Sequence, residues 1–78
     1  MKEEIRELLE NALPLVNFDS DFLFSELDSL GIASILMILS DRYSIKLEHS
    51  DVTPRNFKTI DSLVQMVQDK LNGDAAHA

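Results

Sequence analysis

The sequence contains no cysteine, and it has only two glycines and two prolines among its 78 residues. Without cysteine there is no disulfide framework and no thiolate metal site, which is compatible with a cytoplasmic location. The few glycines and prolines leave few breaks in regular structure, and a hydrophobic content of 45% is too high for a disordered chain. We therefore expect one compact helical domain, whose single small core leaves little room for an enclosed active site.

Basic residues are also scarce: the chain has seven Lys and Arg against 14 Asp and Glu, and its net charge is −7. Nucleic acids and anionic membrane surfaces repel such a chain, so its expected partners have basic docking surfaces. The two histidines, His49 and His77, lie far apart without metal-ligand spacing, so we expect no metal site. The longest wholly apolar run, 35–39, is far shorter than the roughly 20 residues of a membrane span, and no secretory leader is evident.

Hydrophobic periodicity predicts an all-α fold. Apolar side chains recur at helical spacing near both ends of the chain and in its middle, and Pro14 ends the first of these segments. Between Leu15 and Ser25 no period is sustained, so we expect a long loop that aromatic side chains hold against the core. Thr53-Pro54 has the pattern of a helix start, with Phe57 turned inward. The predicted helices are 2–13, about 30–43, a short third helix from Thr53, and about 60–71.

These elements make a small four-helix bundle, with three main helices plus the short third helix. The glutamates of the first helix are expected to form a solvated face. In the second helix, Ala33 and Met37 lie one turn apart beside the inward stripe and can be partly exposed, although a core position for Met37 is equally open. Asn72-Gly73 is expected to stop the last helix, which gives one domain over 1–72 and a flexible tail over 73–78.

The stretch from Glu26 to Tyr43, ELDSLGIASILMILSDRY, contains the acidic turn Asp28-Ser29-Leu30. Asp28 and Ser29 both suit a helix boundary, because their side-chain oxygens can accept from the free backbone N–H groups of a first helical turn. The same helix end, with its unpaired N–H groups and positive dipole end, would also stabilise a phosphate attached to Ser29. Local chemistry alone leaves a helix cap and a modification site open.

The wider pattern resembles the acyl and peptidyl carrier protein family. The resemblance covers most of the chain and is carried by Asp28-Ser29-Leu30, the apolar helix after it, Tyr43 fourteen residues beyond the serine, and the segment TPRNFKTI at 53–60. Gly31 makes it closest to stand-alone specialised and D-alanyl-type carriers. The resemblance implies that Ser29 carries a 4′-phosphopantetheine arm, which holds an acyl or aminoacyl group as a thioester. It also implies a carrier protein with no catalysis of its own.

The implied partners are a phosphopantetheinyl transferase, an acyl- or aminoacyl-adenylating ligase, and acyltransferases or ketosynthases of fatty acid or polyketide biosynthesis. The expected protein is an acidic phosphoprotein, a cytoplasmic monomer without a nucleic-acid partner or a membrane span. The resemblance makes Asp28 part of transferase recognition and Leu30 an apolar docking contact. The other residues expected to meet partners are Glu26, Gly31, Ala33, Met37 and Asp41.

Two features depart from the common pattern of the family. Glu26 stands three residues before the serine, where many relatives have glycine. The second predicted helix is poor in acids, with Gly31, Ser34 and Ser40 at positions where fatty-acid carriers often have Asp or Glu. Because charge matching sets partner choice and association rate, we expect a dedicated carrier that serves its own ligase or biosynthetic pathway.

Other interpretations of these motifs have less support in the sequence. Ser34 imitates the modified serine of many carriers, but Tyr43 comes too early after it, and it would lie inside the helix. A hydrolase serine would need a base and an oxyanion hole, and no Gly-x-Ser-x-Gly elbow is present. Asp19-Ser20-Asp21 lacks the glycine and the terminal glutamate of an EF-hand loop, which favours a cap or turn over cation binding. An aminoacyl, D-alanyl-type carrier and a cofactor-free helical interaction module both stay open.

Overall fold

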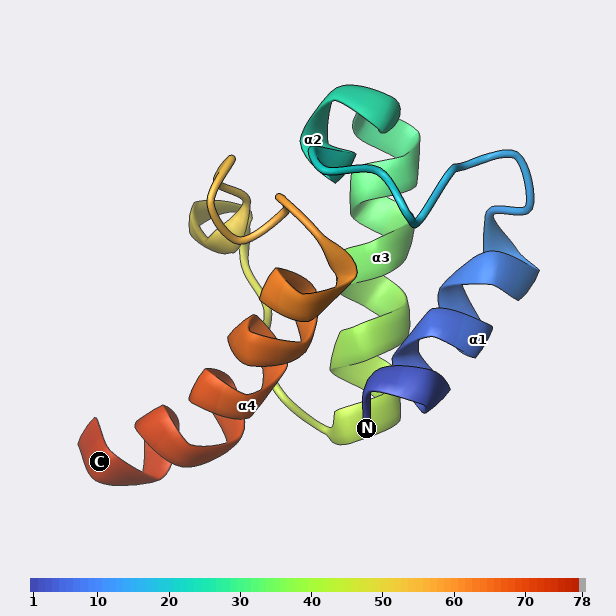
Figure 1. The fold of residues 1–78 in the computed structure, drawn as a ribbon. Helices are drawn as coiled ribbons and strands as arrows, with labels where there is room; N and C mark the ends of the chain where they lie inside the picture. Colours follow the sequence, from blue (N-terminus) through green and yellow to red (C-terminus); the bar gives the residue numbers. More distant parts are fainter. Residues whose placement is uncertain (78) are drawn as a thin grey trace.

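The first helix, α1, spans Lys2–Ala12 and ends beside Pro14, close to its predicted limit. We describe the protein from a computed structural model, which covers residues 1–77 and the side chains of residues 1–73 (Figure 1). Ile5 and Leu9 of α1, one turn apart, are fully buried, as the helical period predicts. The Leu13 amide closes the helix by donating to the Leu9 carbonyl at 2.8 Å.

The loop between the first two main helices contains an element that the sequence analysis missed. A single helical turn, α2, spans Leu23–Glu26. Its first residue is fully buried, and the Leu23 amide donates to the Lys58 carbonyl at 2.7 Å. No local period could signal this turn, because a distant segment of the chain supplies its anchor. The predicted aromatic contact is confirmed at Phe18, which is buried in the core.

The central helix, α3, spans Ser29–Tyr43 and begins one residue before its predicted start. Its buried side is formed by Gly31, Ile35 and Leu39, at intervals of one helical turn. The helix ends at Ser44, whose backbone has a left-handed conformation with φ of 52°. The Ser44 amide donates to the Ser40 carbonyl there, in the manner of a C-terminal αL cap.

A short helix that was not predicted precedes the turn expected from Thr53. It is a 3₁₀ helix, η1, at His49–Asp51, and Glu48 and Asp51 exchange capping hydrogen bonds across it. Residues 54–57, where the helix was expected, form a turn in which Thr53 Oγ1 accepts from the Asn56 amide at 3.0 Å. The expected capping chemistry of threonine is present, but only one turn follows it. The inward position of Phe57 is confirmed, since its side chain is fully buried.

The last helix, α4, spans Ile60–His77 and is longer than predicted. Thr59 caps its start as expected: Thr59 Oγ1 accepts from the Ser62 amide, and Ser62 Oγ accepts from the Thr59 amide. The expected stop at Asn72-Gly73 is wrong, because the helical backbone continues through Gly73. A glycine inside a helix costs only about 1 kcal/mol and does not end it by itself. The flexible tail was predicted over 73–78, and the side chains of 74–78 lie outside the described part of the chain.

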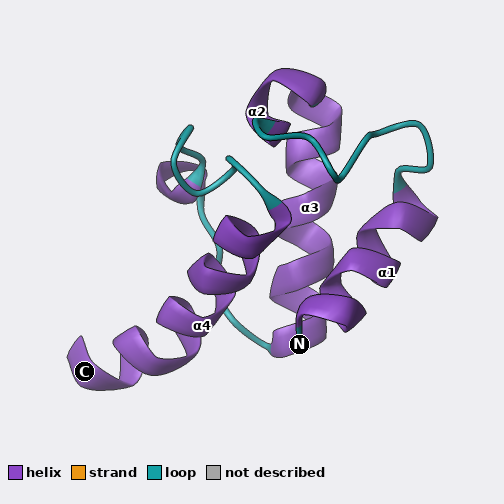
Figure 2. Ribbon diagram, in the orientation of Figure 1, coloured by secondary structure: helices purple, strands orange, loops and turns teal. Residues whose placement is uncertain are grey.

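The core lies where α1, α3 and α4 meet, since each of these helices contacts the other two. The described residues contain helices and loops and no strand, which confirms the all-α fold (Figure 2). On α4, Met66 is buried in the core, whereas Leu71 nearer the end of the helix is 40% exposed. Among the described residues, no helix has the length and apolarity that crossing a membrane requires. The fully buried side chains are Ile5, Leu9, Leu23, Ile35, Leu39, Phe57, Leu63 and Val67.

Candidate functional site

The candidate site is the N-terminal end of α3. Asp28 is the N-cap, and the Gly31 amide donates to Asp28 Oδ1 at 2.8 Å. The next amide, that of Ile32, donates to the Asp28 carbonyl at 3.0 Å. The predicted cap is therefore confirmed for Asp28. Because these two bonds use the third and fourth amides of the helix, the amides of Ser29 and Leu30 remain as donors at its end.

Ser29 is the first residue of α3, and it is exposed. Its neighbour Leu30 is 76% exposed, so the approach to the serine is open on that side. A phosphate on the serine hydroxyl would lie at the positive end of a 15-residue helix. Ser34, the competing serine, is half-buried and more than one turn inside the helix, where the amides are already used. The geometry therefore accommodates a bulky phosphate group at Ser29 and disfavours it at Ser34.

Gly31 is buried, unlike the other residues expected to meet partners. A Cβ atom at this position would lie 3.3 Å from Asp28 Oδ1 and 3.3 Å from Leu27 Cδ2. The absence of a side chain thus gives room to the cap and to the packing of Leu27 beneath it. A side chain at this position would therefore require small shifts of these two neighbours, and the role of Gly31 in recognition stays a prediction.

An exposed apolar stripe continues from Ser29 along the outer side of α3. Leu30, Ala33 and Met37 lie at helical spacing along it, and Met37 is 67% exposed. The expected exposure of Ala33 and Met37 is confirmed, and a core position for Met37 is wrong. At Met37, the residue of the stripe nearest the C-terminus of α3, the stripe borders a groove of about 400 Å³ between α1 and α3. The groove is lined by Leu8, Met37, Ile38, Asp41 and Arg42.

Three acidic side chains flank the stripe in the sequence. Glu26 and Asp28 are exposed beside the serine, and Asp41 is exposed at the far end near the groove. Within the described part of the chain, none of these three carboxylates forms an ion pair. They are therefore available to cationic groups of a partner, and the uncharged positions between them leave the middle of the face apolar.

The opposite end of α3 is fastened to α1 by a polar contact. Tyr43 Oη donates to Glu4 Oε1 at 2.5 Å, and Arg42 Nη2 donates to Glu4 Oε2 at 2.6 Å. The hydrogen bond from Tyr43 and the Arg42 guanidinium lower the pKa of Glu4. Burial and the Glu4 carboxylate raise the pKa of Tyr43 to about 12. The expectation that Glu4 belongs to a purely solvated face is wrong, because periodicity does not show which glutamate has a partner 39 residues away.

Other possible sites do not assemble around Ser29. His49 lies in η1, away from the start of α3 in the chain, and within residues 1–73 no histidine bonds to Ser29. Asp19 bonds to Arg6 Nη2 at 2.7 Å, and Ser20 Oγ accepts from the Phe22 amide, so this segment is a turn. Among the described residues, no cluster of three His, Cys, Asp or Glu side chains could hold a metal ion.

Comparison with known proteins identified one family. The model of the family described as "Phosphopantetheine attachment site" matches residues 1–67, which include α1, α2, α3 and the start of α4. No curated protein and no solved structure matched the chain in the same comparisons. The matched range contains the whole candidate site at the start of α3.

Proposed function

The chain belongs to the phosphopantetheine attachment family, whose members carry 4′-phosphopantetheine covalently on a serine, and we propose that this serine is Ser29. The protein would then be an acyl carrier that presents an acyl or aminoacyl group to partner enzymes of a dedicated pathway, as a cytoplasmic monomer. When attached, the arm supplies a thiol that holds the cargo as a thioester. Carrier domains of this family are not catalytic themselves, so enzymes such as a transferase and a ligase must act on the chain.

The observation that carries this proposal is the position of Ser29 as an exposed first residue of a long helix. In the attachment step, a bond forms between Ser29 Oγ and the phosphorus of the pantetheine phosphate. The pyrophosphate bond of coenzyme A breaks, 3′,5′-ADP leaves, and the transferase accepts the hydroxyl proton. The exposed hydroxyl can reach a transferase without any movement of the core.

The local electrostatics of this site combine attraction with repulsion. The free amides of the first turn stabilise a phosphodiester on Ser29, because they lie at the positive end of the helix dipole. The Asp28 carboxylate would repel the same phosphate. The Gly31 amide partly offsets this repulsion, because it donates a hydrogen bond to Asp28 Oδ1. Asp28 can thus preserve the helix start while its outer oxygen remains accessible to a transferase.

The stripe of Leu30, Ala33 and Met37 supports a docking face next to the arm. Its apolar middle would bury against a partner, while Glu26, Asp28 and Asp41 would pair with basic groups at the rim. Fatty-acid carriers often have more acids on this helix, so a partner that depends on them would bind this chain weakly. We therefore assign the carrier to a dedicated pathway, with an aminoacyl, D-alanyl-type role as the second candidate.

Mass spectrometry after incubation with coenzyme A and a broad-specificity phosphopantetheinyl transferase tests the attachment site. We expect wild-type protein to gain the mass of one phosphopantetheine, Ser29→Ala to gain none, and Ser34→Ala to gain it as wild type does. An unmodified wild-type protein would favour a cofactor-free interaction module. A mass gain that persists in Ser29→Ala would place the arm elsewhere.

Two further measurements separate the candidate pathways. Screening adenylated fatty acids and amino acids for loading onto the modified protein would identify the cargo class. Binding to a fatty-acid ketosynthase, at equal ionic strength, should be weaker than that of a carrier with an acid-rich recognition helix. Equal binding would contradict the dedicated partner while leaving the attachment at Ser29 intact.

A further inference from the structure

Two of the seven basic side chains differ from the rest in having no acidic partner among the side chains of residues 1–73. Lys2, Arg6, Arg42, Lys46 and Lys70 each form an ion pair. Arg55 and Lys58 form none with the side chains of residues 1–73, and both are exposed. In a chain of net charge −7, cations that remain unpaired are the exception. They therefore mark the part of the surface most able to attract an anionic group.

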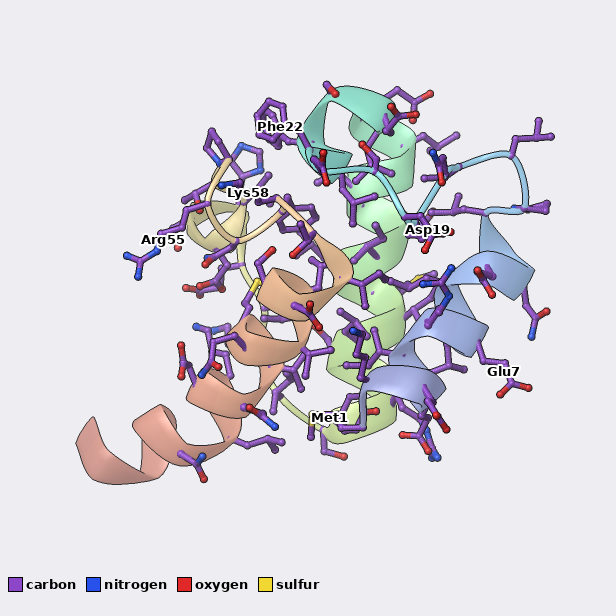
Figure 3. All side chains as sticks on the ribbon, viewed as in Figure 1. Met1, Glu7, Asp19, Phe22, Arg55 and Lys58 are labelled. Atoms are coloured by element: carbon purple, nitrogen blue, oxygen red, sulfur yellow. The ribbon has the colours of Figure 1, made fainter. Side chains whose placement is uncertain are left out.

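The turn before α4 places Lys58 next to α2, and Arg55 lies three residues earlier in the same turn. The Lys58 carbonyl accepts from the Leu23 amide at 2.7 Å, so the turn and α2 are held together by their backbones. Buried Phe57 and the Thr59–Ser62 cap fix the turn on either side of Lys58. Figure 3 shows Lys58 and Phe22 at the same end of the molecule and Arg55 pointing outward from the turn. The fold thus fixes the backbone from which both cationic side chains project.

An exposed aromatic ring accompanies the two cations. Phe22 is 41% exposed although it directly precedes the fully buried Leu23. Its ring lies 6.0 Å from that of Phe24, measured between ring centroids, and its carbonyl accepts from Ser25 Oγ at 2.8 Å. The backbone around Phe22 is therefore fixed while its ring remains available. We call Phe22, Arg55 and Lys58 the cationic patch.

The carboxylate that could neutralise Arg55 has another partner. Asp69 lines the same groove of about 290 Å³ as Arg55. Its Oδ1 accepts from Gln65 Nε2 at 2.9 Å, and within the described residues no ion pair joins it to Arg55. An incoming carboxylate would thus find the Arg55 guanidinium without an ion pair to displace, although the Asp69 charge in the same groove reduces the attraction.

We propose that the cationic patch is a second docking surface, which binds a partner protein through carboxylates flanking an apolar side chain. Two cations suit a few carboxylates on a protein, whereas the net charge of −7 repels extended polyanions such as nucleic acids and anionic membranes. The apolar side chain would pack on Phe22. Since α2 leads into Ser29 within three residues, a partner on this patch would lie near the attachment point but off the acidic face of α3.

This surface is opposite in charge to the face formed by Leu30, Ala33 and Met37 with their neighbouring acids. A partner with a basic docking site would bind along α3, and a partner with an acidic docking site would bind the cationic patch. The carrier could therefore distinguish two classes of partner by charge alone. The inference goes beyond the proposed attachment chemistry, because the patch exists whether or not Ser29 is modified.

NMR titration of the full chain, labelled with ¹⁵N, tests the proposal. The probe is a short capped peptide of glutamate and leucine, and the comparison is a lysine and leucine peptide of equal length. We expect the acidic peptide to shift the amides of 22–24 and 55–59 saturably, and the basic peptide to shift amides along α3. Acidic-peptide shifts that are absent or that map to α3 would overturn the proposal.

Charge reversal provides the matched control. Arg55→Glu with Lys58→Glu should weaken acidic-peptide binding by about tenfold or more. Lys2→Glu with Lys46→Glu changes the net charge equally but should weaken binding far less, since both lysines lie outside the patch and are already paired. An equal loss in both double variants would show a net-charge effect and overturn the proposal.

Two further variants and two polyanions complete the test. Phe22→Ala should weaken binding severalfold with an unchanged far-UV spectrum, and Ser29→Ala should bind as wild type does. Failure of the patch thus remains distinguishable from failure of the attachment proposal. Tighter binding to single-stranded DNA or to phosphatidylserine vesicles than to the acidic peptide, lost in the Arg55→Glu and Lys58→Glu variant, would replace the proposed protein partner.

Discussion

The two ends of α3 differ in what surrounds them. At its start, Ser29 and Leu30 are exposed, and the Asp28 side chain provides the cap. At its other end, Tyr43 and Arg42 both bond to Glu4 of α1 across the helix interface. One helix thus carries an open end suited to chemistry and a fastened end that maintains the fold. Substitutions at the open end should affect function with little loss of stability, and substitutions toward the fastened end should do the reverse.

Two identical substitutions within α3 should show the largest contrast. Leu39→Ala removes a fully buried side chain and should lower the free energy of unfolding by about 2–5 kcal/mol. Leu30→Ala removes one that is 76% exposed and should change it by less than about 0.5 kcal/mol. Urea denaturation measures both values. A large loss in Leu30→Ala would show that the open end also supports the fold.

Removal of the cap should have an intermediate effect. Asp28→Ala leaves the Gly31 amide without its acceptor and should cost about 1 kcal/mol. Asp28→Asn keeps an oxygen acceptor and should cost only a few tenths of that. The rate at which coenzyme A and a transferase modify the asparagine variant separates the capping role of Asp28 from its role in transferase recognition. A slower modification of Asp28→Asn at unchanged stability would assign the carboxylate to transferase recognition.

At the fastened end, Tyr43→Phe should lower the free energy of unfolding by about 1 kcal/mol. The variant loses a partly buried hydrogen bond to the Glu4 carboxylate, which then bonds to water instead. Thermal or urea unfolding provides the measurement, and phosphopantetheine attachment should be unchanged. Glu4→Gln is the companion variant, since it keeps the shape of the side chain and removes its charge. Slower attachment in Tyr43→Phe would contradict the separation of the two ends.

The same contact predicts how stability depends on pH. The pKa of Glu4 is lowered in the fold, so its contribution is complete above its ordinary value of 4.5 and is lost as the pH falls below it. The pKa of Tyr43 is raised from 10.0 to about 12, so its contribution is lost as the pH rises through that interval. Glu4→Gln should reduce the loss of stability at acid pH, and Tyr43→Phe should reduce the loss of stability at alkaline pH. The measurement is the urea midpoint of each variant and of wild type, taken below pH 4.5 and between pH 10.0 and about 12.

The smallest effect is expected at Gly31. Alanine improves helix propensity by up to about 1 kcal/mol, but its Cβ must displace Asp28 Oδ1 or Leu27 Cδ2, which lie 3.3 Å away. Both atoms belong to side chains that can adjust, so we expect Gly31→Ala to be slightly stabilising, by less than about 1 kcal/mol. Urea denaturation of the variant and of wild type gives the sign of the change in the free energy of unfolding. Slower modification of a stable Gly31→Ala variant would support the predicted partner contact.

The sequence alone determined the helices that local patterns specify. The period of Ile5 and Leu9, the Asp28 cap, and the Thr59 cap of α4 all lie within one or two turns of chain, so propensity and spacing suffice to predict them. The proposal for Ser29 needed the longer pattern through Tyr43 and the segment 53–60, because local chemistry leaves a helix cap and a modification site open. Hydrophobic periodicity predicted the all-α class, and the few glycines and prolines were consistent with long uninterrupted helices.

The tertiary structure decided what distant segments contribute. α2 forms where the Lys58 carbonyl accepts from Leu23, and Glu4 becomes a partner of Tyr43 only when α1 packs on α3. The cationic patch likewise required the fold, because Phe22 and Lys58 are far apart in the chain. These features depend on contacts between residues more than 30 positions apart, which hydrophobic periodicity does not encode. The fold thus left one end of α3 open and fastened the other.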